Sequence, residues 1–167
     1  MGPSVTVTVP GVSSAHLLEA WMTNHRINVM VVKALSPDAL RSTLSTRGGR
    51  DVARQFAHLH NVRIWHLEKR ARELAEGLTA FESKHSPSKR ELLESLEAST
   101  GAIGTFLTDV LEGKPKRRGF RKGIFTTLAY FIAHESHHRG SILLTLKQCG
   151  HLPDKNVTMG IWGWDQR

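Results

Sequence analysis

A chain of 167 residues is long enough to bury the core of one domain, and we predict a single domain over residues 1–167. Its 40% apolar and 23% charged residues argue against disorder over most of the length, and its single cysteine excludes an internal disulfide and a cysteine-rich zinc site. The net charge of +8 is compatible with an acidic partner.

The first part of the chain predicts a leader followed by a helix. We expect the leader, residues 1–12, to be disordered or to form a short edge strand. It lacks the basic and apolar regions of a signal peptide, and no apolar run of the chain is long enough to span a bilayer, so we expect a cytoplasmic protein. Apolar residues at three- and four-residue spacing then predict a helix over residues 16–35, with Ser13 or Ser14 as its N-cap.

Two further amphipathic segments follow a short turn at residues 36–40. The second helix is predicted over residues 51–75, with Asp51 as a good N-cap. The third is predicted over residues 88–113, because Ser88 and Glu91 have the spacing of a capping box. A loop is expected between these two helices.

The fourth helix is predicted over residues 122–150, with Gly150 in the position of a C-cap glycine. The tail, residues 151–167, contains Pro153 and is expected to be irregular. Four helices of roughly 20 to 30 residues joined by modest loops imply an all-α fold, a four-helix bundle.

The stretch His134–His138 in the fourth helix carries the strongest chemical signal, with the sequence His-Glu-Ser-His-His. Its first and last histidines lie four residues apart, so they project from one face about one turn apart and can reach one metal ion. A third ligand is needed, and the second helix offers His58 or His60. These two diverge by about 200° around a helix, which leaves the choice between them open. Weaker candidates are three other histidines, His16, His25 and His66.

Glu135 falls within the apolar arc of the fourth helix, where a carboxylate is costly unless a cation or a hydrogen-bond donor satisfies it. Arg63, on the core face of the second helix, is one candidate partner. A metal ion bound by His134 and His138 would supply such a cation near Glu135. Glu135 would then either orient a metal ligand or accept a proton. His137 points away from this face, and we expect it to be exposed.

Two other interpretations of these histidines compete with a metal site of this kind. Ten histidines in 167 residues make chance pairs at four-residue spacing common, so His134 and His138 could be surface or capping residues. The pattern His-Glu-x-x-His also matches zincin peptidases, with Glu135 as general base. However, no glutamate follows Glu135, and Leu144 stands where the extended motif needs its third histidine. The chain thus has the spacing of the first two metallopeptidase ligands but lacks the third ligand downstream.

Two segments, His-Leu-His-Asn-Val-Arg-Ile-Trp at residues 58–65 and Ala-His-Glu-Ser-His-His-Arg-Gly-Ser at residues 133–141, are similar to those of a known group of proteins. The chain resembles the DinB-like superfamily, which includes the YfiT-type metal-dependent hydrolases and the bacillithiol- or mycothiol-dependent transferases. The order and spacing of the helices match too, so the resemblance covers nearly the whole chain. It implies an up-down-down-up four-helix bundle and, as is frequent in such families, a homodimer.

The resemblance also implies a divalent metal, commonly zinc or nickel, bound by three histidines. His134 and His138 match the family's fourth-helix ligands, and His58, seven residues before Trp65, fits the second-helix ligand best. The implied activity is that of a hydrolase or a thiol transferase, in which water or a low-molecular-weight thiol at an open coordination position becomes the nucleophile. The alternative is a non-catalytic metal-binding or stress-related helical module.

Whether the metal site is open or closed distinguishes these alternatives. An open position lined by Trp21, Asn24 or Trp65 would favour catalysis on a small-molecule substrate, whereas a closed site would favour a structural role. The basic run at residues 114–122 is interpreted as a solvated loop between two helices. Nucleic-acid binding by this run remains a secondary hypothesis, because the chain has no helix-turn-helix, zinc-finger or RNA-recognition signature.

Overall fold

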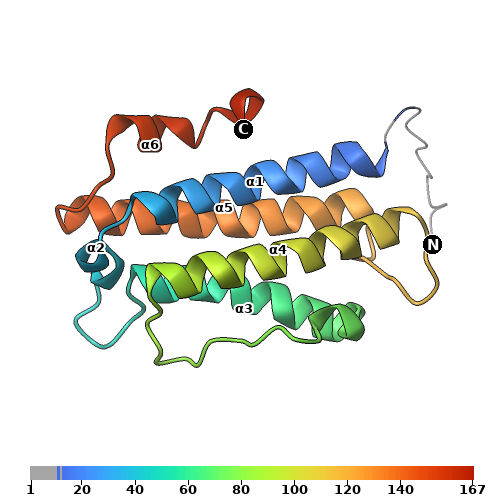
Figure 1. Ribbon diagram of the computed structural model, residues 1–167, viewed down its shortest axis with the longest axis horizontal. Coiled ribbons are helices and arrows are strands. Elements are labelled where there is room, and N and C mark those ends of the chain that lie inside the picture. The colour runs from blue at the N-terminus through green and yellow to red at the C-terminus, as the bar shows by residue number, and fades with distance from the viewer. Residues whose placement is uncertain (1–10, 12) are drawn as a thin grey trace.

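The computed structural model describes residue 11 and residues 13–167, so the predicted leader lies, apart from Gly11, outside the described residues. Within the described part the chain is helical, which confirms the all-α prediction (Figure 1). The α-helices are α1 (Ser14–Ala34), α2 (Pro37–Arg41), α3 (Val52–Arg70), α4 (Lys89–Leu111), α5 (Ile124–Gln148) and α6 (Lys155–Gly160). Two short 3-10 helices, Arg72–Ala75 and Trp164–Gln166, complete the described secondary structure.

The four long helices form a bundle in which α1 and α5 run in one direction and α3 and α4 in the other (Figure 1). The two middle helices can be parallel because the connection between them, residues 71–88, returns along the length of the bundle. The predicted up-down-down-up topology is therefore confirmed. It places α5 against α3, and this contact builds the candidate site.

Local sequence signals lie at most of the helix ends where they were predicted. Ser13 is the N-cap residue of α1, and the Asp51 side chain accepts a hydrogen bond from the backbone N–H of Arg54 at the start of α3. Ser88 and Glu91 form the predicted capping box of α4. Gly150, just beyond α5, has a φ of 77°, a conformation that glycine adopts without steric cost.

The second predicted helix ends earlier than expected, because α3 stops at Arg70 and not near residue 75. Ala71 leaves the helical conformation, with φ −161° and ψ 57°, and the next residues form a 3-10 turn. This break lets Leu74 and Leu78 turn back onto the apolar core, where they are partly buried.

The core consists of two apolar clusters. One is built around Phe56, Leu92 and Ile142, and the other around Trp21, Phe106 and Phe131. Between them along the four long helices lie buried polar residues, among them Asn24 and Asn28 on α1, Arg63 on α3, Ser99 and Thr100 on α4, and Glu135 and Arg139 on α5. A polar layer of this kind is tolerated in a core only when its groups satisfy one another.

The tail is less irregular than predicted, since it contains α6, which contacts α1 (Figure 1). The Asp154 side chain caps this helix by accepting hydrogen bonds from the backbone N–H groups of Asn156 and Val157. Val157 and Ile161 then pack against the core. Among the described residues, no helix is both long and apolar enough to cross a membrane.

Candidate metal centre

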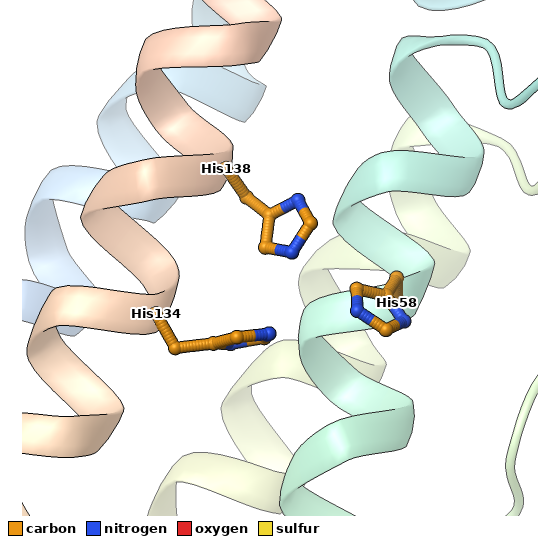
Figure 2. A group of neighbouring side chains, drawn as sticks. All are labelled: His58, His134 and His138. Atoms are coloured by element: carbon orange, nitrogen blue, oxygen red, sulfur yellow. The ribbon is translucent and has the colours of Figure 1, made fainter.

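Three histidine side chains from two helices converge in the structure. His58 lies in the second turn of α3, and His134 and His138 lie one turn apart on α5, with all three rings pointing toward a common point (Figure 2). Each contributes a ring nitrogen, and these three nitrogens lie within 4.8 Å of one another. The ring centroid of His58 lies 5.4 Å from the ring centroid of His134 and 4.8 Å from that of His138. Such a group is compatible with the binding of a divalent metal.

The tertiary structure distinguishes His58 from His60, a choice that the helical wheel left open. His60 is 2% exposed and is absent from the converging group, and its Nε2 atom lies 3.0 Å from the carbonyl oxygen of Thr79. His60 therefore fastens the connection between α3 and α4 to the bundle. His58, on the other side of the same helix, joins the histidines of α5.

The remaining candidate histidines have hydrogen-bonding or packing partners outside the converging group. His16 contacts Ser13 at the start of α1, and His25 contacts Glu97 and Thr100 of α4. His66 packs against Tyr130 and Phe131, and His137 is exposed, as its position on the wheel predicted.

The environment keeps the three converging imidazoles neutral. Burial, and after it the positive charges of Arg50 and of a protonated His134, lower the pKa of His58 to about 4. Burial and the neighbouring histidines likewise lower the pKa of His138 to about 4, and burial lowers the pKa of His134. A neutral imidazole carries the free lone pair that a metal ion needs. The donor set is thus in its metal-binding protonation state at neutral pH.

Glu135 lies next to His134 in sequence but points into the core. Its side chain is 1% exposed, and its Oε1 atom accepts a hydrogen bond of 2.8 Å from Nε of Arg63. Its Oε2 atom accepts hydrogen bonds of 2.6 Å from Asn24 and 2.7 Å from Asn28. Burial alone would raise the pKa of Glu135, but the charge and hydrogen bond of Arg63 and the other donors lower it. The carboxylate is therefore ionised, and the predicted partner Arg63 is confirmed.

The Glu135 carboxylate is the centre of a network that joins all four long helices. Arg63 also donates to the backbone oxygen of Leu96 and to the hydroxyl groups of Ser99 and Thr100 on α4. Arg139 donates to the side-chain oxygens of Asn24, Asn28 and Ser136. The sequence reasoning did not identify Asn28 and Arg139. The available signal was the pair of asparagines four residues apart within the apolar stripe of α1.

Two hollows open beside His58. The first, which we call the Arg54 hollow, has a volume of about 400 Å³ and is lined by residues that include Arg50, Arg54, His58, Trp65 and Phe81. The second, which we call the Tyr130 hollow, has a volume of about 370 Å³ and is lined by residues that include His58, Trp65, Lys69, Tyr130 and His134. Trp65 lines both, as expected for an open site. Trp21 and Asn24 were also candidate lining residues, but both are fully buried in the core.

The basic run at residues 114–122 is partly neutralised by neighbouring carboxylates. Lys114 forms an ion pair of 2.5 Å with Asp109, and Arg117 lies between Asp109 and Glu73. These contacts attach the run to the end of α4. Nucleic-acid binding by its remaining cations stays a secondary hypothesis.

The lowered pKa values of two histidines outside the converging group predict how acid affects the stability of the protein. Burial lowers the pKa of His25, and burial together with Arg70 lowers the pKa of His66 to about 4. Histidines of the unfolded chain are protonated below about pH 6.5, so the unfolded state binds more protons than the folded state in this range. We therefore expect the free energy of unfolding to fall as the pH drops from about 6.5 toward about 4, in urea titrations of metal-free protein. Replacing His66 by phenylalanine should reduce this slope, and a slope unchanged by that variant would contradict the assignment.

A comparison with known protein families gives a match over most of the chain. The model of the family described as the DinB family matches residues 4–158 of the chain. This range contains the four long helices and all three converging histidines. No curated protein gives a significant match.

Proposed function

The chain belongs to the DinB family, and on this premise we propose that it is a metal-dependent enzyme whose divalent ion is bound by His58, His134 and His138. The observation that carries the proposal is the convergence of three ring nitrogens within 4.8 Å of one another. Helices α3 and α5 contribute these nitrogens from opposite sides, so both helices hold the site rigidly. Zinc and nickel are the metals that we expect, because both accept neutral imidazole ligands.

The proposed reaction is either hydrolysis of a substrate by water or attack on an electrophilic substrate by a low-molecular-weight thiol. A divalent ion with an open coordination position would supply the nucleophile, because it lowers the pKa of bound water or thiol toward neutrality. The chain's own contribution is to keep the three imidazoles neutral and to leave space for a small molecule. Trp65 and Tyr130 form apolar walls next to His58 and His134, where they would exclude water from one side of a substrate.

Of the two roles predicted for Glu135, its hydrogen bonds favour the orienting one. Both carboxylate oxygens accept hydrogen bonds from side chains of α1 and α3, and the residue is 1% exposed. A group that exchanges protons with a substrate needs to reach it directly or through a water molecule. We therefore propose that Glu135 is a positioning residue, which sets the rotation of α5 and with it the direction of His134 and His138.

The alternative of a non-catalytic metal-binding or stress-related module predicts a closed site. The two hollows beside His58 favour the catalytic proposal, because each is large enough for a small molecule. The homodimer implied by the family resemblance and the cytoplasmic location stay predictions.

Metal analysis of protein purified without a histidine tag tests the proposal. We expect about one equivalent of zinc or nickel per chain by elemental analysis, identified by an X-ray absorption edge scan. Dialysis against a chelator should remove the ion, and added zinc should restore one equivalent. Substoichiometric metal in protein refilled with zinc, nickel, cobalt or manganese would overturn the proposal.

A further inference from the structure

Arg50 lies at the junction of two hollows beside the three-histidine site. It lines the Arg54 hollow together with His58. It also lines a third hollow, which we call the Ser141 hollow, together with His138 and Ser141. The charge of Arg50 lowers the pKa of both His58 and His138, as expected from a cation close to each ring. One arginine thus faces the candidate metal ligands of both α3 and α5.

The guanidinium of Arg50 is available to a ligand, in contrast to that of Arg54. Arg54 donates to the backbone oxygens of Ser83 and Gly49, so its charge is committed to holding the connection between α3 and α4. Arg50 is exposed, and among the described residues no hydrogen bond or ion pair engages its guanidinium. The sequence places Arg50 at the start of α3, because Arg50 directly precedes Asp51, the N-cap of that helix.

The rest of the Arg54 hollow has ordered walls. Asn61 exchanges two hydrogen bonds with the backbone of Phe81, which holds the connecting segment against α3. Trp65 and Phe81 give apolar surface, and Glu82 is the one carboxylate among the described lining residues. A volume of about 400 Å³ is suited to a small molecule.

We propose that Arg50 binds the anionic group of a small organic substrate, a carboxylate or a phosphate, whose reacting atom lies at the three-histidine site. The inference rests on the proposed metal function and adds to it a class of substrate. The apolar part of the molecule lies against Trp65 and Phe81, and the anion lies against the guanidinium. Arginine suits this role because its donors match the geometry of carboxylate and phosphate oxygens.

Cobalt-loaded protein and two matched thiols test the inference. The probes are 3-mercaptopropionate and its neutral isostere 3-mercaptopropionamide, each of which binds cobalt as the thiolate and releases its proton to the buffer. Thiolate-to-cobalt absorption gives a Kd for each probe at constant ionic strength. The readout is the ratio of the two Kd values in each variant, because the intrinsic difference in thiol acidity is the same in all of them. Arg50→Gln should shift this ratio by about tenfold against the anionic probe.

Arg47→Gln is the matched control, since Arg47 lies in the same exposed loop but not among the residues that line either hollow. It removes the same charge and should leave the ratio at the wild-type value. A ratio that Arg50→Gln leaves unchanged, or that Arg47→Gln shifts equally, would overturn the inference while the metal proposal stands. A chain that takes up neither cobalt nor zinc, nickel or manganese would instead refute the metal proposal and this inference with it.

Discussion

Replacing His134 by alanine is expected to abolish stoichiometric metal binding while the bundle stays folded. The variant removes one of three imidazoles whose nitrogens lie within 4.8 Å of one another. Loss of a group that only supports a ligand costs about 10- to 100-fold in metal affinity, so loss of a ligand should cost at least about 100-fold. Elemental analysis and competition with a chelator measure the change, and circular dichroism of the metal-free protein monitors the fold.

Two neighbouring substitutions provide matched controls. His137→Ala removes an exposed imidazole from the same turn of α5 and should leave metal content unchanged. His58→Ala should lose the metal, whereas His60→Ala should retain it and lose stability, because His60 is buried against Thr79. Retention of one equivalent of metal by both His134→Ala and His58→Ala would rule out the proposed ligand set.

Replacing Glu135 by alanine is expected to destabilise the protein by about 3–5 kcal/mol, the usual cost of removing one partner of a buried ion pair. The substitution leaves the fully buried guanidinium of Arg63 without its carboxylate and removes the acceptor of Asn24 and Asn28. Arg139, which donates to the same two asparagines, would also lose the compensating negative charge. Urea unfolding of the metal-free protein measures the free-energy difference.

A surface ion pair and a double variant provide the controls for this prediction. Arg90 and Glu94 form an exposed pair one turn apart on α4, and Arg90→Ala should cost less than about 0.5 kcal/mol. Combining Arg63→Met with Glu135→Leu should be less destabilising than Glu135→Ala alone, because no unmatched charge is left from that pair. If Glu135→Ala lowered the free energy of unfolding by no more than Arg90→Ala does, the network could not be what sets the rotation of α5.

A milder variant separates positioning from a purely structural role. Glu135→Gln keeps the size of the side chain and removes its charge. If Glu135 orients α5 for metal binding, metal affinity should fall by about 10- to 100-fold in this variant while three ligands remain.

The helices could be predicted from the sequence because their signals are local. Apolar spacing depends only on residues within a few turns, and Asp51 and Ser88 cap their helices through atoms three residues away. The pairing of His134 with His138 is local in the same sense, since a helix always brings such residues to one face. The end of α3 was predicted less well, because the break after Arg70 depends on the core contacts of Leu74 and Leu78.

By itself, the sequence determined four amphipathic helices, a histidine pair on the last of them, and a buried glutamate that required a cationic partner. The helical wheel could not choose between His58 and His60, and the family resemblance favoured His58, which the tertiary structure places beside this pair. Only the tertiary structure decided that two asparagines join Arg63 at the glutamate and that Arg50 faces two hollows. The reason is physical. Helical periodicity gives the direction of each side chain around its own axis, whereas contacts between helices depend on how the axes are rotated and shifted relative to one another.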